Sequence, residues 1–132
     1  MADEENPLEE LHIDANEFDR EALADFLKQY VAIDEDTGEP RFLGEYDDLG
    51  GEKQIVTVLL YRKAARDLGH YEEEGLSSRA LSEHVSVGKS TVSRHTKELE
   101  FVDNDGDRGG YFIIEPGLHT AIDFVEAEEK GE

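Results

Sequence analysis

The stretch from residue 77 to residue 114 constrains the fold of this chain more than any other part of its sequence. It begins with two serines, and Ser77 can cap a short helix over residues 79–85. The apolar positions of this helix lie four residues apart and so share one face: Leu81 and Val85. Residues 86–88 include a glycine and end the helical pattern, so a tight turn is expected there.

A second helix is predicted to begin at Lys89, with Gly88 as its cap. Three residues at helical spacing face a core: Val92, Thr96 and Leu99. The opposite face carries hydroxyls and cations: Ser90, Thr91, Ser93, Arg94 and Lys97. Two short helices joined by a tight turn, the second with a polar and cationic outer face, are typical of a helix-turn-helix.

A β-hairpin is predicted directly after the second helix. Residues 101–102 and 111–114 are rich in aromatic and β-branched side chains, and residues 103–110 between them favour a turn. The order helix, turn, helix, hairpin is that of a winged helix-turn-helix, which would place Arg108 near the tip of the wing. The predicted fold class is mainly α with a small β-hairpin.

The charge distribution agrees with a surface that contacts phosphates. The whole chain has a formal net charge of −21. Between Ser77 and Glu100, however, four cations oppose three carboxylates, which gives this segment a charge of +1 and leaves −22 for the rest. A local departure from so acidic a background is what DNA binding would require.

The segment LSSRALSEHVSVGKSTVSRHTKELEFVDNDGDRGGYFII resembles the DNA-reading core of archaeal and bacterial winged-helix transcription regulators. In these proteins a KSTVSRHLKxLE-like recognition helix and a wing containing RGG recur. With its flanking helices and acidic composition, the whole chain resembles small haloarchaeal regulators of the RosR type, which are related to PadR-like proteins. The resemblance implies a homodimeric DNA-binding protein that acts in the response to oxidative stress. Two residues depart from the common pattern: Thr96 replaces a leucine, and Gly88 replaces a serine cap.

The winged-helix interpretation assigns roles to seven residues and involves double-stranded DNA as the partner. Ser90, Thr91 and Arg94 would face base edges, and the forked guanidinium of Arg94 can address a guanine. Phosphates would be contacted by Lys89, Ser93 and Lys97. Arg108 would reach the adjacent minor groove from the wing.

The remainder of the chain divides into three parts. Residues 1–13 lack periodicity and are expected to form a mobile arm. Residues 14–51 contain a helix predicted over 17–31, then a loop or small hairpin. The winged domain is assigned to residues 52–115 and begins with a helix over 52–68, with Gly69 as its C-terminal stop and Leu68 on its apolar side. A last amphipathic helix lies within residues 116–132.

The N-terminal and C-terminal helices have apolar stripes that need a partner surface. For the N-terminal stripe, packing within the subunit and packing against a second copy are both open from the sequence. Because a winged helix is usually complete without such additions, the two helices are expected to form the dimer contact. The expected assembly is therefore a homodimer with N- and C-terminal dimerisation helices.

Composition restricts the function classes further. The chain has 132 residues and no cysteine, which suits one domain and leaves no disulfide, zinc ribbon or thiol chemistry. No apolar run approaches the ~20 residues of a membrane span and the N-terminus is acidic, so we expect a cytoplasmic protein without membrane contact. Dispersed carboxylates and few lysines favour a protein adapted to high intracellular salt, where charge repulsion is screened and salt cations are bound.

Two other function classes agree less well with the sequence. A winged helix can act as a protein–protein interaction module that does not read DNA, but such a module would not need an exposed Ser, Thr, Arg and Lys face. A metal-dependent hydrolase or nuclease would need motifs that the sequence lacks, so no enzyme activity and no cofactor is expected. The acidic segments DEDTGE and EYDD lack the spacing of a calcium-binding loop, and His119 with Asp123 is more simply a solvated pair, so no metal site is predicted.

Overall fold

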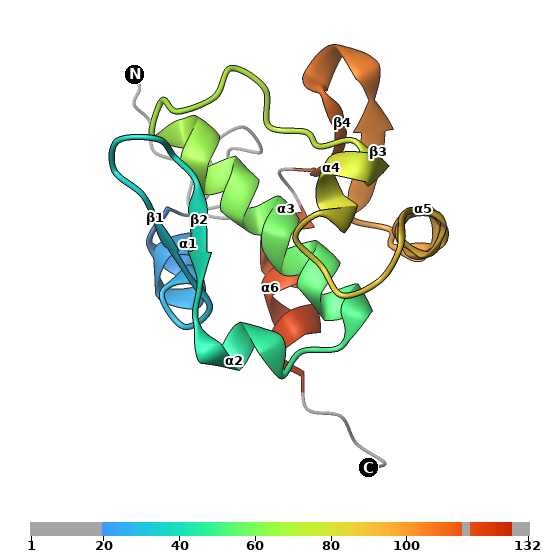
Figure 1. Cartoon of the computed structure of the whole chain (residues 1–132), viewed down its shortest axis with the longest axis horizontal. Helices are drawn as coiled ribbons and strands as arrows, with labels where there is room; N and C mark the ends of the chain where they lie inside the picture. Colours follow the sequence, from blue (N-terminus) through green and yellow to red (C-terminus); the bar gives the residue numbers. More distant parts are fainter. Residues whose placement is uncertain (1–19, 115–116, 128–132) are drawn as a thin grey trace, which may run out of the picture.

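The structure, a computed structural model, describes residues 20–114 and 117–127. Over these ranges the chain is mainly helical, with two separate antiparallel hairpins (Figure 1). The elements in chain order are α1 (Arg20–Leu27), β1 (Val31–Ile33), β2 (Pro40–Phe42), α2 (Gly44–Asp47), α3 (Gly51–Asp67), α4 (Ser78–Ser82), α5 (Lys89–Glu98), β3 (Val102–Asp105), β4 (Gly110–Ile113) and α6 (Leu118–Glu126). This arrangement is compatible with a winged helix-turn-helix.

Helix α3 is the centre of the molecule. In Figure 1 it crosses the view, with α1 and the β1–β2 hairpin on one side and α4, α5 and the β3–β4 hairpin on the other. Its apolar side chains are buried almost all the way round, including Ile55, Val58 and Leu59 as predicted. Leu68 was placed on the same side by the sequence, and that was wrong: it caps the helix end and is 64% exposed. The chain turns away there through Gly69, which has a φ of 93°.

Helix α1 ends earlier than the sequence predicted. The expected helix reached Val31, but the regular helix stops at Leu27, and the amides of Gln29 and Tyr30 donate to the carbonyls of Phe26 and Leu27 in turns. Val31 instead pairs with Phe42 as the first residue of β1. A β-branched residue fits this extended position well, and helical spacing alone does not reveal the competing strand. The predicted start of the helix lies before the described residues.

The stretch between α1 and α3 forms the small hairpin that was one of the two predicted alternatives, and α2 follows it. The Asp34 carboxylate closes the hairpin turn by accepting bonds from the amides of Asp36 and Thr37, at 2.8 and 3.1 Å. These bonds lower the pKa of Asp34. Pro40 is the first residue of β2. Proline is tolerated there because its backbone nitrogen does not have to donate a hydrogen bond to a neighbouring strand. The short helix α2 was not predicted.

The apolar faces of α1 and α6 are buried within this one chain. Leu23 and Phe26 of α1 and Leu118, Ile122 and Val125 of α6 belong to the same core cluster as the residues of α3. The expectation of free apolar stripes for dimerisation is therefore not met in the described residues, because α3 is buried on several sides along its middle and packs against both helices. Their presence gives no evidence of a dimer contact.

Some predictions fall on residues that the structure does not describe. The arm over 1–13, the start of the first helix and the end of the chain after residue 127 are among them. Among the helices that are described, none has the length and apolar character needed to cross a bilayer.

Candidate nucleic-acid interface

Helices α4 and α5 form the predicted pair. The Ser77 hydroxyl caps α4 by accepting a bond from the amide of Ala80 at 3.1 Å, and Leu81 is fully buried. The helix is shorter than predicted, because the amides of Glu83 and His84 donate three residues back instead of four. Helix α5 begins at Lys89 after Gly88, as predicted, and its apolar face is buried: Val92, Thr96 and Leu99.

Thr96 departs from the leucine of the common pattern without leaving an unsatisfied group. Its hydroxyl donates to the backbone carbonyls of Val92 and Ser93, at 3.0 Å in each case. A buried threonine that bonds back within its own helix meets its polar requirement, although its smaller side chain fills less of the core than a leucine would.

The outer face of α5 carries the six predicted helix residues at different exposures. Four are exposed: Lys89, Ser90, Arg94 and Lys97. Thr91 and Ser93 are half-buried along the edges of this face. All six lie on one helix. They could therefore contact one ligand together if that ligand has a groove wide enough to admit a helix.

The Lys and Arg side chains of this helix pair have no partner among the described residues, unlike the other described cations. Most other described Lys and Arg side chains bind carboxylates or backbone carbonyls, as Arg20 does with Asp67 and Arg41 does with Asp34. Within the described ranges, the cations that make no ion pair, hydrogen bond or ring contact all lie on α4 and α5: Arg79, Lys89, Arg94 and Lys97. Arg79 was not among the predicted site residues, and only its position on the first helix of the pair could have suggested it.

Gln54 of α3 positions the turn between the two helices. Its side-chain oxygen accepts bonds from both the amide and the hydroxyl of Ser86, each at 2.9 Å. Its amide nitrogen donates to the carbonyl of Tyr46 in α2 at 3.2 Å, and the Tyr46 hydroxyl donates to the carbonyl of His84 at 2.6 Å. Gln54 is buried, so the central helix and α2 together fix where α5 begins.

The β3–β4 hairpin follows α5, where the sequence predicted a wing. Val102 pairs with Ile113 and Asp105 with Gly110, and one 3-10 turn over residues 106–108 joins the strands. The connector between α3 and α4, residues 68–77, lies along the hairpin. Leu76 and Tyr111 exchange backbone hydrogen bonds at 2.9 and 2.8 Å. A Cβ at Gly75 would lie 2.5 Å from the Arg108 carbonyl, so the close approach of the connector requires glycine.

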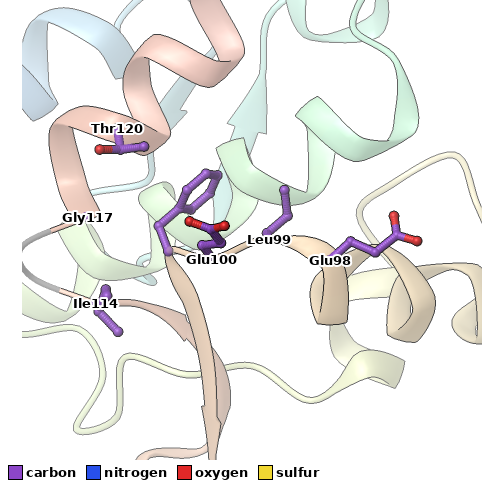
Figure 2. A pocket seen from close by; sticks show the side chains of 7 residues that line it. Glu98, Leu99, Glu100, Ile114, Gly117 and Thr120 are labelled. Atoms are coloured by element: carbon purple, nitrogen blue, oxygen red, sulfur yellow. The ribbon is translucent and has the colours of Figure 1, made fainter.

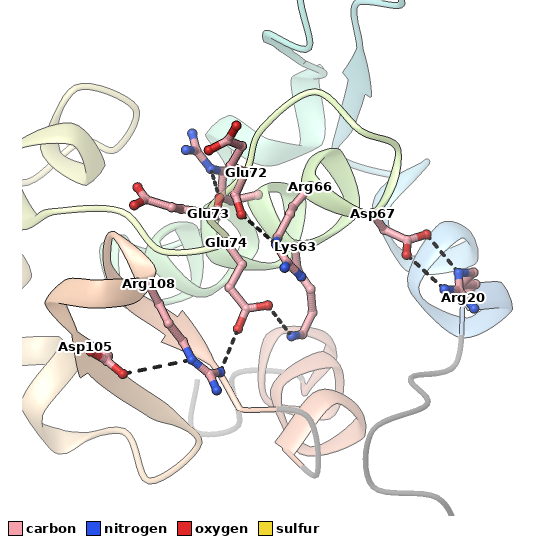
Figure 3. A network of polar contacts seen from close by, with 10 residues as sticks. Arg20, Lys63, Arg66, Asp67, Glu72, Glu73, Glu74, Asp105 and Arg108 are labelled. Carbon is pink, nitrogen blue, oxygen red and sulfur yellow. Dashed lines mark hydrogen bonds and ion pairs between the residues drawn. The ribbon is translucent and has the colours of Figure 1, made fainter.

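Arg108 lies at the hairpin turn as predicted, but its side chain is held by the protein. The guanidinium is 3.3 Å from the Glu74 carboxylate (Figure 3). It is also 4.8 Å from the centre of the Phe112 ring. Glu74 is also 3.3 Å from Lys63, and these two side chains are only 7% and 3% exposed. The expected projection of Arg108 into a minor groove is not what this structure shows, because the buried Glu74 binds it.

The cations at the end of α3 hold the connector that leads to α4. Arg62 and Arg66 donate to the carbonyls of Glu73 and Glu72, each at 3.0 Å (Figure 3). Burial lowers the pKa of Arg62, whose guanidinium also stacks 3.7 Å from the centre of the Tyr71 ring. These contacts agree with a structural role for this cluster and leave it little freedom to bind phosphates.

Two hollows of about 400 Å³ and 390 Å³ adjoin the helix pair. The first lies where α5, β3 and α6 meet and is lined by Glu98, Leu99, Glu100, Phe101, Ile114, Gly117 and Thr120 (Figure 2). It contains two carboxylates and no cation among these residues, so it does not suit an anionic ligand. The second contains Tyr61 and Tyr71, whose hydroxyls both lie within hydrogen-bonding distance of the Gly38 carbonyl and so are already engaged.

Comparisons of this chain with protein-family models, with curated proteins and with solved structures found no match. The resemblance to winged-helix regulators of the RosR type therefore stays a prediction.

Proposed function

We propose that this chain is a sequence-specific DNA-binding transcription regulator that uses α5 as its recognition helix. The observation that carries the proposal is the location of the unpaired cations. In a chain of net charge −21, exposed Lys and Arg side chains would be expected to find carboxylate partners, as they do elsewhere in the described structure. A surface on which they stay unpaired suits an external polyanion.

Each exposed residue of α5 has a role in this proposal. Arg94 lies in the middle of the outer face and would address a guanine, with Ser90 and Thr91 at neighbouring base edges. Lys89, Ser93 and Lys97 would contact phosphates and set the register of the helix. Arg79 of α4 adds one phosphate contact that the sequence did not suggest.

Arg108 receives a different role from the one first expected. Reaching into a minor groove would separate it from Glu74, and a buried carboxylate that loses a partner is costly. We therefore assign Arg108 to holding the wing against the connector. The wing would then contact DNA through its backbone and the exposed part of this guanidinium, which is 54% exposed.

The homodimer remains part of the proposal and rests on the resemblance. Two protomers would bind a site with two-fold symmetry, one recognition helix to each half-site. Because the apolar stripes of α1 and α6 are buried in the protomer, any dimer contact made by these helices must use their other faces. The composition adds action in the cytoplasm at high salt, with bound salt cations, and the resemblance adds a part in the response to oxidative stress.

The proposal is tested by selecting binding sites from random double-stranded DNA at about 2 M KCl, where the Debye length is below 3 Å. Fluorescence anisotropy on the selected site then compares two variants of equal charge. One carries Lys89→Gln and Arg94→Gln on α5. The matched control carries Lys28→Gln and Arg41→Gln, which are also exposed but are paired with acidic residues away from the helix pair.

The expected result is an enriched sequence that the control variant binds as the wild type does and the α5 variant does not bind. Equal losses in both variants would show that binding follows total charge and not the face of α5. Failure to enrich any sequence, with a folded protein, would contradict DNA reading and favour the alternative, a winged-helix module that binds another protein.

A further inference from the structure

A cluster of three side chains joins the recognition helix to the central helix. Glu52 lies in the first turn of α3, and His95 and Glu98 lie three residues apart on α5. One ligand atom from each residue can be chosen so that all three lie within 4.8 Å of one another. Residues three apart on a helix share a face, so two of the groups converge through α5 and the third comes from a different element.

One nitrogen in this cluster lacks a hydrogen-bond partner. In the part of the chain that is described, Nδ1 of His95 is the one buried side-chain nitrogen or oxygen in this condition. It faces the Glu52 carboxylate at 3.7 Å, too long for a hydrogen bond. A buried imidazole nitrogen without a partner costs free energy, whereas a metal ion placed between it and a carboxylate would use its lone pair.

We propose that Glu52, His95 and Glu98 bind a divalent transition-metal ion such as Zn²⁺. One imidazole nitrogen and two carboxylate oxygens form a ligand set suited to this ion, with water at the remaining position. Ligand bonds of about 2.0–2.2 Å bring ligand atoms roughly 3.5 Å apart, so the present spacing needs only small side-chain adjustments. Mg²⁺ and Ca²⁺ prefer ligand sets made entirely of oxygen and fit this cluster less well.

The bound ion would stabilise the position of α5 relative to α3. It would also neutralise two carboxylates, of which Glu98 is exposed on α5 beside Lys97. Both effects favour binding of a polyanion by the outer face of this helix. This regulatory consequence rests on the proposed function, whereas the metal site itself does not.

The site is tested by titrating Zn²⁺ into the full-length, metal-free protein and measuring heat and the unfolding midpoint. About pH 8 keeps free imidazole neutral, and about 2 M KCl suppresses nonspecific binding to the acidic surface. The variants are His95→Gln and Glu98→Gln, the second at an exposed position that should leave the fold intact. The matched control is His119→Gln, an exposed histidine with Asp123 one turn away on α6.

The expected result is one Zn²⁺ per chain, with a raised unfolding midpoint. Removing one ligand should weaken binding by about 100-fold or more, because even supporting residues around metal sites contribute 10- to 100-fold. His119→Gln should bind as the wild type does. Equal affinity in the wild type and Glu98→Gln, or no binding by the wild type, would overturn the site.

A DNA titration separates this inference from the proposed function. Zn²⁺ should raise the affinity of the wild type for its selected site and leave Glu98→Gln unchanged. Stoichiometric Zn²⁺ binding that leaves DNA affinity unchanged would overturn the regulatory role while the metal site stands. Zn²⁺ binding by a protein that selects no DNA sequence would contradict the proposed function alone.

Discussion

Arg94 and Arg41 are both exposed arginines in this acidic chain, but only Arg41 has a carboxylate partner, at 3.7 Å. We predict that Arg94→Ala lowers affinity for the selected DNA site while the fold survives, because its side chain is exposed and makes no ion pair, hydrogen bond or ring contact with the described residues. Loss of one bidentate base contact should cost about 1–3 kcal/mol per half-site. Anisotropy titration measures the affinity, and thermal melting checks the fold.

Arg41→Ala provides the comparison for this prediction. It removes the same charge from an exposed position outside the helix pair and should change specific affinity little. If Arg94→Ala binds the specific site and an unrelated sequence with the same ratio as the wild type, α5 does not read bases through this residue.

His84 predicts a dependence of stability on pH. Burial lowers the pKa of its imidazole below the ordinary value near 6.5, with Glu83 opposing the shift and Arg62 adding to it. Between these two pKa values the unfolded chain binds a proton at His84 that the folded chain does not. The free energy of unfolding should therefore fall as the pH is lowered through about 6.5. Below the pKa of His84 in the folded protein, His84 causes no further fall.

Denaturant unfolding of the wild type and His84→Gln at several pH values tests this. The variant keeps the backbone carbonyl that accepts the Tyr46 bond, so its fold should be retained. It should lose less stability than the wild type between about pH 7.5 and pH 5.5. Parallel curves for the two proteins would show that His84 titrates alike in the folded and unfolded states.

Individual residues on α5 could be predicted because helical spacing separates the buried side from the outer side. Val92 and Thr96 lie four residues apart on the core face. This helical spacing can be recognised without knowing which distant residues they contact. Arg108 could not be placed in the same way. Its partner Glu74 is 34 residues earlier, and one sequence gives no signal that joins them. The unpartnered nitrogen of His95 depends equally on Glu52, which lies on another helix.

At the scale of elements, the long helix α3 and the α4–α5 pair follow from local signals such as caps, glycines and apolar spacing. The sequence does not indicate that α3 is buried on several sides. This burial determines where the terminal helices pack. Because α3 offers apolar surface on several sides, α1 and α6 pack inside the protomer. The short elements α2 and β1 contain too few residues for a periodic signal, and contacts with α3 and β2 determine them.

Gln54 offers a test of how elements position one another. Gln54→Leu would remove the acceptor for Ser86 and the donor to Tyr46, so we predict a loss of about 1–3 kcal/mol in the free energy of unfolding. We also predict weaker DNA binding well below the melting temperature, although Gln54 is buried and cannot touch DNA. Denaturant unfolding and anisotropy provide the two measurements.

The control for this variant is Gln29→Leu, since Gln29 is exposed and bonded only weakly to Glu126 at 3.4 Å. It should alter neither property appreciably. Unchanged DNA affinity in folded Gln54→Leu would mean that the turn at Ser86 keeps α5 in place without this residue.

In the proposed function, a molecule with a net charge of −21 binds a polyanionic ligand. Ordinary DNA-binding proteins lose affinity steeply as salt rises, because neutralised phosphates release counterions. Here the exposed carboxylates beside the outer face of α5 would repel phosphates unless cations were taken up: Glu83, Glu98 and Glu100. We predict that specific affinity stays flat or rises between about 0.5 and 2 M KCl, where the Debye length is already near or below about 4 Å.

Anisotropy titrations over this salt range, with folding followed by circular dichroism in the same samples, test the prediction. A steep fall in affinity while the protein stays folded would mean that these carboxylates lie away from the DNA and that conventional counterion release dominates.

Oxidant response, if the resemblance extends to it, must be indirect in this molecule. The chain has no cysteine and only one methionine, Met1, so the usual oxidation of sulfur has almost no target. We predict that peroxide treatment of the purified, metal-free protein leaves its DNA affinity unchanged, as measured by anisotropy before and after treatment. A direct loss of affinity in this preparation would show that another group senses the oxidant.

The close approach of Gly75 to the hairpin turn limits how this protein can fit a groove. Because the connector is bonded along β4 and lies against the backbone at Arg108, the tip cannot lengthen by insertion without losing those bonds. These contacts therefore hold the hairpin turn in place beside the connector. If the protein binds DNA as proposed, the duplex must change its shape to fit the fixed hairpin turn. Sequences that bend or narrow easily would then be preferred, even at base pairs that no side chain touches.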